Sequence, residues 1–305
     1  MSNLKVPKNE STLTLSTLQG YEENFISYLD VDDLTLKAYK VGIENFMSYL
    51  KEHNINMPTR DNVIEYRNHL RETYQDNTVN SYMTALRRLF KYLSLKGLYQ
   101  DLTIDIKGAR HSDTPKKQVL TQEQASMIYK NLTDKREKCL YSLLISTGLR
   151  GVEVARARLE DIKTHNGEVV LWVQCKKHDS RDEYVKLDKQ VLQDILDYVG
   201  DRTTGSIFIS TSNHNKDKGV SIKTLRREIN KILERFGLKD ETMSLHSTRR
   251  TFATISYNNG VDIQQIKQIL HHRSIQTTTK YINASIRDNN NGENIVASAI
   301  LRGGA

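Results

Sequence analysis

Apolar residues in the first part of the chain are spaced as they are on one face of a helix. After Asp32 or Asp33, either of which can cap a helix, they recur at steps of three and four from Leu36 to Leu50. An earlier helix is expected over residues 15–29. This spacing predicts helices that turn one apolar stripe toward a shared core.

Two further helices are predicted before residue 100. Thr59 can cap one of them and Asn77 the other, which Gly97 would end because glycine readily adopts the left-handed conformation of a helix terminus. Four helices within about ninety residues make a small bundle. We therefore expect residues 12–99 to form a helical N-terminal domain.

The second part of the chain combines helical spacing with short apolar runs. Residues 168–174 and 183–187 are predicted as strands, and the polar stretch 175–182 as the turn between them. A short strand or buried segment is expected over residues 206–210. Helices are expected over residues 121–132, 139–146, 188–199, 221–236, 245–258, 262–271 and 274–283. The predicted fold is mainly α, with a small β-hairpin in the second domain.

Between these parts, residues 100–118 show no regular spacing of apolar residues, and we expect an interdomain linker there. The linker is basic because it contains Lys107, Arg110, Lys116 and Lys117. Its charge would let it lie along a DNA backbone as well as join the domains.

The second domain is expected to span residues 119–287, followed by a tail over residues 288–305. The tail contains one apolar run, residues 295–301, which is long enough for a short helix. Such a helix would dock either on a neighbouring subunit or within its own subunit.

Composition narrows the class of protein. The 305 residues include 45 Lys+Arg and 37 Asp+Glu, for a formal charge of +8. The two cysteines, Cys139 and Cys175, are too few for a disulfide framework, and two thiols alone cannot form a structural zinc site. No apolar run is long enough to cross a bilayer, and the first residues lack the apolar stretch of a signal peptide. We therefore expect a cytoplasmic protein with a polyanionic partner.

Positive charge is concentrated in the middle of the chain. Acidic residues outnumber basic ones over residues 1–76, whereas residues 77–118 are the most densely basic stretch. On the predicted fourth helix of the bundle, the one that Asn77 would cap, basic residues lie away from the apolar stripe. They are Arg87, Arg88 and Lys91, with Lys96 at the end of the helix. A basic helix face is often only solvated, but this concentration of charge favours contacts with DNA phosphates.

Residues with catalytic chemistry occur at four separate places in the second domain. They are Arg150 with Glu153, Lys176 at the start of the polar turn, His246 with Arg249 at helical spacing, and His272 before Tyr281. Each place alone has a structural alternative, since ion pairs and single histidines often belong to a core and turn lysines are often solvated. Metal binding by His271 and His272 is disfavoured, because adjacent helical side chains point about 100° apart.

Taken in this order, the motifs resemble those of the tyrosine recombinases, the family of the phage-type integrases. The resemblance covers nearly the whole chain and implies a two-domain, C-shaped clamp around DNA with a helical N-terminal domain. It implies the catalytic residues Arg150, Lys176, His246, Arg249, His272 and Tyr281. Glu153 would orient Arg150, and His272 would either hydrogen-bond the phosphate or support its geometry.

Three places depart from the usual family pattern. Cys175-Lys176-Lys177 stands where Gly-Lys-Gly is usual, and the position at the strand end selects Lys176 as the catalytic lysine. His271 replaces a glycine, so local helix packing is expected to differ, and Arg250 replaces a common histidine.

These residue types suit the cleavage of a phosphodiester. Arg150 and Arg249 can each fork onto the non-bridging oxygens of a five-coordinate phosphorus. The nucleophile Tyr281 would be only about 0.1% ionised at neutral pH, so it needs a base, and His246 is the candidate. Lys176 would protonate the leaving 5′ oxygen. These residues call for neither a metal nor another cofactor. Their side chains supply the positive charge that the transition state needs, and the phosphotyrosyl link conserves the energy of the broken phosphodiester bond.

The resemblance implies a site-specific recombinase that acts on two double-stranded DNA sites through a 3′-phosphotyrosyl intermediate and a Holliday junction. It implies a homotetramer at synapsis, a monomer or dimer before it, and an accessory DNA-bending or directionality protein as a further partner. The departures from the usual family motifs favour an integrase or transposase of a mobile element. A resolvase of chromosome or plasmid dimers is the alternative. A type IB topoisomerase and a non-catalytic DNA-binding relative are less favoured, because the chain is small and every catalytic position is filled.

Overall fold

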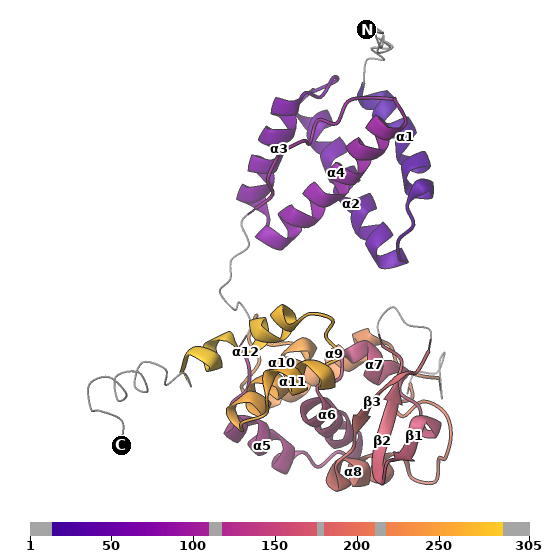
Figure 1. The fold of residues 1–305 in the computed structure, drawn as a ribbon, viewed down its shortest axis with the longest axis vertical. Coiled ribbons are helices and arrows are strands. Elements are labelled where there is room, and N and C mark those ends of the chain that lie inside the picture. The colour runs from indigo at the N-terminus through magenta and orange to yellow at the C-terminus, as the bar shows by residue number, and fades with distance from the viewer. Residues whose placement is uncertain (1–13, 110–117, 176–179, 211–217, 289–305) are drawn as a thin grey trace, which may run out of the picture. The chain divides into compact units, whose positions relative to one another are not determined.

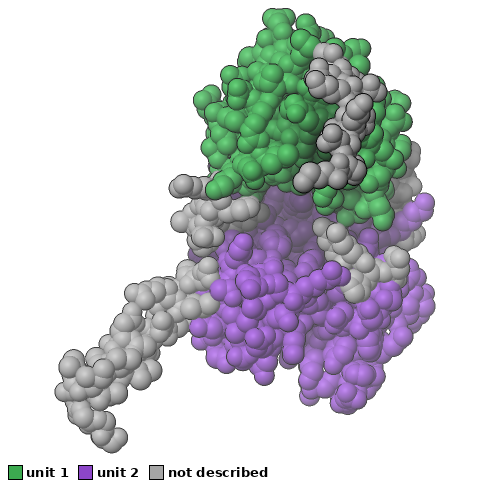
Figure 2. Space-filling view, turned by 45° about the horizontal axis from the view of Figure 1, so that its top comes forward, with its two compact units in different colours: residues 1–113 green, residues 114–305 purple. Residues whose placement is uncertain are grey.

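The computed structural model describes residues 14–109, 118–175, 180–210 and 218–288, with side chains through residue 282. The chain divides into two units, Met1–Asp113 and Thr114–Ala305, each of which is described by itself (Figure 2). Among the described residues, no helix is both long enough and apolar enough to cross a membrane.

The first unit is a bundle of helices, as the spacing predicts. They are α1 (Leu15–Tyr28), α2 (Asp33–Glu52), α3 (Arg60–Thr73) and α4 (Asp76–Leu95). Asp32 and Thr59 cap α2 and α3 as expected. The expected cap at Asn77 is wrong: α4 begins at Asp76, and the first helical hydrogen bond runs from the Val79 amide to the Gln75 carbonyl. The acidic side chain of Asp76 in the first turn suits the positive end of the helix dipole.

The core of this bundle lies between α2 and α4. Gly42 on α2 lets the helices approach closely, because a Cβ there would lie 3.0 Å from the Ala85 Cβ on α4. The ring of Phe46 lies 4.9 Å from the ring of Tyr66 and 6.3 Å from that of Phe90, measured between centroids. Such edge-on aromatic contacts stabilise the fold beyond the contribution from buried apolar area.

Part of the expected linker belongs to this first core. Leu102 and Ile106 are buried in it, and arginines hold the surrounding backbone in place. Arg71 Nη2 donates to the Gly108 carbonyl at 2.6 Å, and Arg87 Nη2 donates to the Ile106 carbonyl at 2.9 Å. The described stretch up to residue 109 is thus attached to the helical bundle.

The second unit is mainly helical with a small antiparallel sheet, which confirms the predicted fold class (Figure 1). Its elements are α5 (Gln122–Asn131), α6 (Lys135–Thr147), α7 (Gly151–Arg156), a 3₁₀ turn (Leu159–Asp161), β1 (Ile162–His165), β2 (Glu168–Val173), β3 (Glu183–Lys186), α8 (Lys189–Val199), α9 (Ile222–Arg235), α10 (Leu245–Asn258), α11 (Ile263–Ile269) and α12 (Ile275–Asp288). The sheet order is β1-β2-β3, and the sheet lies at one edge of the helices.

Strand β1 is not predicted from the sequence. It pairs with β2 through a tight turn at Asn166 and Gly167, whose φ angles of 49° and 79° are both positive. An Asn-Gly turn of this kind is a strong hairpin signal, so the sequence does carry a cue for β1. The expected segment 206–210 is not a regular strand: its backbone forms isolated bridges, while Ile207 and Phe208 are buried.

The ends of α11 and α12 differ from the prediction. Helix α11 ends at Ile269 rather than residue 271, because His271 has a φ of 49°, which is outside the helical region. Helix α12 runs to Asp288, beyond the expected end at residue 283. The predicted apolar run of the tail, residues 295–301, lies outside the described residues.

Candidate active site

The start of α10 brings two predicted site residues together. The amide of Ser244 donates to Ser247 Oγ at 3.0 Å, which fixes the first turn of α10 just before His246. His246 and Arg249 then follow three residues apart on neighbouring positions of one helix face. His246 is exposed, whereas Arg249 is buried, so this face of the helix runs from the surface into the protein.

Helix α12 places Tyr281 beside His246. The Tyr281 hydroxyl oxygen lies 2.8 Å from His246 Nε2, and the two rings meet edge to face at 5.5 Å between centroids. Thr254 Oγ1 on α10 donates to the Tyr281 carbonyl at 3.3 Å, which ties the backbone of α12 to α10. Tyr281 is half-buried, so its hydroxyl is held in place but can be reached from outside.

Arg249 is held by backbone carbonyls. Its side chain is 1% exposed, and Nη1 donates to the Gly148 carbonyl at 2.6 Å, while Nη2 donates to the Leu270 carbonyl. Burial, followed by the nearby positive charge of Arg150, lowers the pKa of Arg249 to about 10. The guanidinium therefore stays charged at neutral pH, and its orientation is fixed before any substrate binds.

Glu153 on α7 contacts both arginines. Its side chain is fully buried, Oε1 accepts from Arg150 Nη1 at 2.8 Å, and Oε2 accepts from the Arg150 amide at 2.7 Å. Oε2 also lies 3.9 Å from Arg249 Nη1. One carboxylate thus orients Arg150, which is part-exposed, and partly neutralises two adjacent guanidiniums.

His272 is a second histidine in contact with the Tyr281 ring. Its ring is 5.3 Å from the Tyr281 ring, and its Nδ1 lies 2.9 Å from Thr278 Oγ1. Burial, then the charges of Arg249 and Arg150, lowers the pKa of His272 to about 3. The imidazole is therefore neutral near pH 7. In the tautomer whose Nδ1 accepts from the Thr278 hydroxyl, the ring proton is on Nε2, which can donate to an anion.

Gly148 allows these elements to meet. Its φ is +64°, and a Cβ there would lie 2.5 Å from Phe252 Cδ1 and 2.7 Å from Leu270 Cδ2. Only glycine combines this conformation with this close approach, and the carbonyl that results accepts from Arg249. The Gly148 turn therefore both ends α6 and positions a catalytic candidate.

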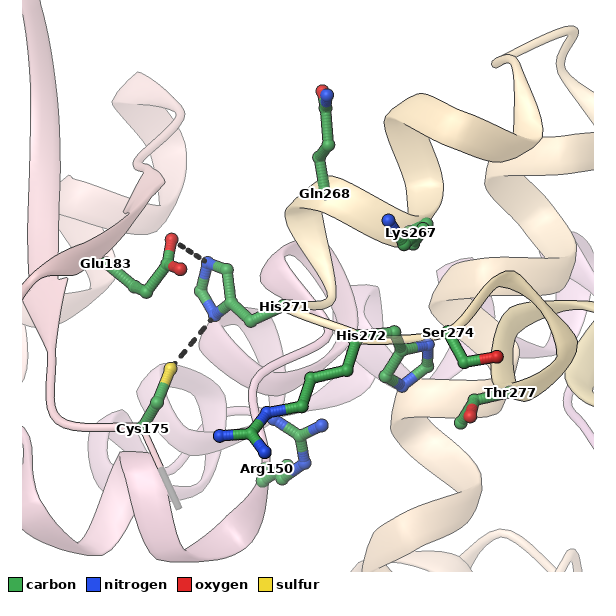
Figure 3. A pocket seen from close by; sticks show the side chains of 10 residues that line it. Arg150, Cys175, Glu183, Lys267, Gln268, His271, His272, Ser274 and Thr277 are labelled. Atoms are coloured by element: carbon green, nitrogen blue, oxygen red, sulfur yellow. Dashed lines mark hydrogen bonds and ion pairs between the residues drawn. The ribbon is translucent and has the colours of Figure 1, made fainter. Parts of the chain in front are cut away.

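A cavity of about 700 Å³ opens next to this cluster (Figure 3). Arg150 and His272 line it, together with Cys175 at the end of the β2 segment. The predicted catalytic lysine, Lys176, lies outside the described residues, as does Lys177. Cys175, the last described residue before Lys176, lines the cavity.

Two contacts close to Tyr281 are not predicted from the sequence. Thr278 bonds His272, and Arg250 places its guanidinium carbon 5.9 Å from the centroid of the Tyr281 ring. Burial lowers the pKa of Arg250. Neither contact has a local sequence signal, because both depend on how α10 and α12 pack.

The predicted DNA-binding residues have different surroundings. Arg88, Lys91, Lys96 and Lys107 are exposed, Arg87 is half-buried against the linker backbone, and Arg110, Lys116 and Lys117 lie outside the described residues. A second basic surface, on α9, is not predicted from the sequence. Its exposed residues are Lys223, Arg226, Arg227 and Lys231, opposite the buried apolar positions of the same helix. Helical spacing of these charges was the available signal.

Two family models match the chain. The Phage integrase family matches residues 118–287, and the Phage integrase, N-terminal SAM-like domain matches residues 8–97. The chain belongs to the phage integrase family. The resemblance inferred from its motifs is therefore confirmed, and the two matches lie on the two units of the structure.

Curated relatives of this integrase-family chain are named tyrosine recombinases. Tyrosine recombinase XerA of Pyrococcus furiosus is 27% identical over 266 residues, covering 85% of this chain and 87% of the relative. Tyrosine recombinase XerC of Staphylococcus aureus is 25% identical over 303 residues, covering 93% of this chain and 90% of the relative.

Solved structures share the fold of this integrase-family chain. The XerH site-specific recombinase bound to its difH substrate before cleavage has a TM-score of 0.71 at 17% identity, covering 96% of this chain and 99% of that chain. A lambda integrase dimer bound to a COC′ core site has a TM-score of 0.67 at 17% identity, covering 87% and 76%.

Proposed function

We propose that this chain is a site-specific DNA recombinase that cleaves and rejoins DNA strands through Tyr281. The observation that carries the proposal is the 2.8 Å contact between the Tyr281 hydroxyl and His246 Nε2, next to the buried, charged Arg249. A phenol hydrogen-bonded to an imidazole is an activated nucleophile, and fixed guanidiniums stabilise developing negative charge. Relatives named tyrosine recombinases support the same activity.

The first chemical step follows from these positions. The Tyr281 oxygen attacks the scissile phosphorus, and its proton passes to His246 Nε2. A tyrosine–phosphorus bond forms while the bond from phosphorus to the 5′ oxygen breaks. Arg150 and Arg249 neutralise the non-bridging oxygens, and Lys176 gives the leaving 5′ oxygen its proton.

The second step reverses the first on a different strand. A 5′ hydroxyl from the partner DNA attacks the phosphotyrosyl bond and releases Tyr281. Because each step exchanges one phosphodiester for another, the reaction draws on no nucleotide or other energy source. His272, neutral and carrying a proton on Nε2, hydrogen-bonds the phosphate throughout.

The substrate in this proposal is double-stranded DNA carrying paired recombination sites. The solved neighbours named above include recombinases bound to their own DNA sites. In this proposal both units contact the duplex, with phosphate contacts from the basic faces of α4 and α9 and from the linker. The working assembly is a homotetramer, built from monomers or dimers at synapsis in the cytoplasm, with an accessory DNA-bending or directionality protein as a further partner.

Both biological roles expected from the sequence fit this chemistry. Relatives include recombinases named XerA and XerC, and the solved neighbours include an integrase of the Tn1549 transposon. Integration of a mobile element and resolution of DNA dimers use the same cleavage and rejoining. The comparisons support the two roles equally.

A plasmid assay tests the proposal. A binding site is first selected from random duplexes, and two copies are then placed on one supercoiled plasmid. We expect inversion or excision between the copies, and no change in a plasmid that carries no copy. Relaxation of the plasmid without a site would instead identify a type IB topoisomerase, and binding without strand exchange would identify a non-catalytic DNA-binding protein.

A further inference from the structure

Three side chains with metal-binding chemistry meet at the edge of the cavity described above. They come from separate elements: Glu153 from α7, Cys175 from the end of the β2 segment, and His271 from the turn after α11. One ligand atom of each lies within 4.8 Å of the others, and Cys175 Sγ is 3.4 Å from His271 Nδ1. Cys175 and His271 also occupy two of the places where the chain departs from the family motifs.

The orientation of His271 is the one that a metal ligand needs. Its Nε2 lies 3.3 Å from the Tyr184 carbonyl and 3.7 Å from a Glu183 carboxylate oxygen, so the ring proton sits on Nε2 (Figure 3). The lone pair of Nδ1 then faces the Cys175 sulfur. Metal-bound histidines typically donate their second nitrogen to a carbonyl or carboxylate in this way, which fixes the tautomer and the ring.

The spacing of the sulfur and nitrogen suits a tetrahedral cation. Zinc binds sulfur at about 2.3 Å and nitrogen at about 2.0 Å, which puts the two ligand atoms about 3.5 Å apart. The observed separation between Cys175 Sγ and His271 Nδ1 is 3.4 Å. The cavity of about 700 Å³ beside these atoms gives a cation an entry path and leaves room for a water ligand.

Charge around the cluster is compatible with a divalent cation. Glu153 contributes a buried carboxylate, and Glu183 adds a second carboxylate next to His271. These two carboxylates and a Cys175 thiolate face Arg150, Arg249 and the incoming cation. Each carboxylate oxygen has more than one acceptor site, so Glu153 can bind a cation while keeping contact with Arg150.

We propose that Cys175, His271 and Glu153 form a binding site for a thiophilic divalent cation such as zinc. On binding, the Cys175 thiol releases its proton to solvent, and the sulfur, Nδ1 of His271, one Glu153 oxygen and a water complete the coordination. The cation is an inhibitor rather than a catalyst. It draws charge from the carboxylate that orients Arg150, and it clamps the residue before Lys176. The inhibition rests on the proposed recombinase function, whereas the binding does not.

A cobalt titration of the full chain tests the binding. Cobalt(II) replaces zinc and reports a thiolate ligand by charge-transfer absorption in the near ultraviolet. We expect this absorption in the wild type, its loss when zinc is added, and at least about tenfold weaker binding in Cys175→Ser and in His271→Gly. The matched control is Cys139→Ala, which removes the other cysteine, buried in α6, and should leave the absorption unchanged.

The outcomes separate this site from the recombinase activity. Absence of the charge-transfer band in the wild type, or an equal band in Cys175→Ser, overturns the site whatever the protein does to DNA. Glycine suits the φ of +49° at position 271, so we expect His271→Gly to fold. It is the test variant if Cys175→Ser does not fold. Zinc should slow formation of the covalent protein–DNA complex in the wild type but not in His271→Gly. Equal slowing in both overturns the inhibitory role.

Discussion

The hydroxyl oxygen of Tyr281 lies 2.8 Å from Nε2 of His246, although the two residues are 35 positions apart in the chain. The contact joins α12 to the first turn of α10 and sets the proposed nucleophile beside the proposed base. Arg249, one helical turn further along α10, is buried and held by two carbonyls. The packing of two helices therefore decides whether the chain can act on a phosphodiester.

His246→Gln tests the role of the base. A phenol with an ordinary pKa near 10 is about 0.1% ionised at pH 7, so loss of the base should slow cleavage by about 10²–10⁴-fold. Cleavage by the variant should then rise about tenfold per pH unit, because hydroxide from solution has to replace the missing base. The measurement is the single-turnover rate of covalent complex formation between about pH 7 and pH 9. A variant whose rate follows the wild-type pH profile would rule out this role.

Glu153→Gln tests the buried carboxylate between the two arginines. The substitution keeps the size of the side chain but leaves the Arg249 and Arg150 guanidiniums facing each other without a negative charge. Breaking a buried ion pair from one side typically costs about 3–5 kcal/mol in the free energy of unfolding. Urea unfolding gives this quantity.

The control for this variant is Glu168→Gln. Glu168 pairs with Lys186 on the exposed surface of the sheet, where an ion pair is worth at most about 1 kcal/mol. Equal losses of stability in the two variants would contradict the role given to Glu153.

Gly148→Ala tests the turn that positions Arg249. The added methyl group meets Phe252 and Leu270 at less than contact distance, in a backbone conformation that disfavours any side chain. We expect a loss of about 2–4 kcal/mol in the free energy of unfolding, from strain and overpacking together. Gly237→Ala has a similar φ of +67° but open space around it, so it should cost only about 1 kcal/mol. A Gly148 variant as stable as the Gly237 variant would be inconsistent with close packing at this turn.

Acid should destabilise the protein through His272. Its pKa is lowered from 6.5 to about 3 in the folded state by burial and by the two arginines. Between these values the unfolded chain binds the extra proton, so the folded state loses stability as the pH falls below about 6.5, by up to about 1.4 kcal/mol per pH unit. The free energy of unfolding at pH 5 and pH 7 measures the slope. In His272→Asn, which keeps an acceptor toward Thr278, the slope should be smaller, and an unchanged slope would argue against a neutral His272.

Much of the fold follows from local sequence signals. The caps Asp32, Thr59 and Thr121 all stand where the structure begins a helix, because side-chain oxygens satisfy free amides there. Leu102 and Ile106 were not predicted as core, because they lie in a short stretch that was assigned to the linker. Their burial depends on the bundle that they contact.

The candidate site, like the fold, was predicted only in part from the sequence. Arg150, His246, Arg249, His272 and Tyr281 were selected by the order of their motifs, and the structure brings them close together. The contacts of Thr278 with His272, of Arg250 with the Tyr281 ring and of Cys175 with His271 have no signal in the sequence. They arise where α10, α11, α12 and the β2 segment meet, and the sequence does not state which helices become neighbours.

The central claim is that Tyr281 forms the covalent bond to DNA. A nicked duplex carrying the selected site, from which the cleaved fragment escapes, traps the intermediate, and a denaturing gel then shows any covalent complex. The wild type and the control Tyr257→Phe should give a complex whose phosphodiester maps to Tyr281 by mass spectrometry. Tyr281→Phe should bind the same duplex and give none. A covalent complex in Tyr281→Phe, or a modification mapped to another residue, would contradict the account.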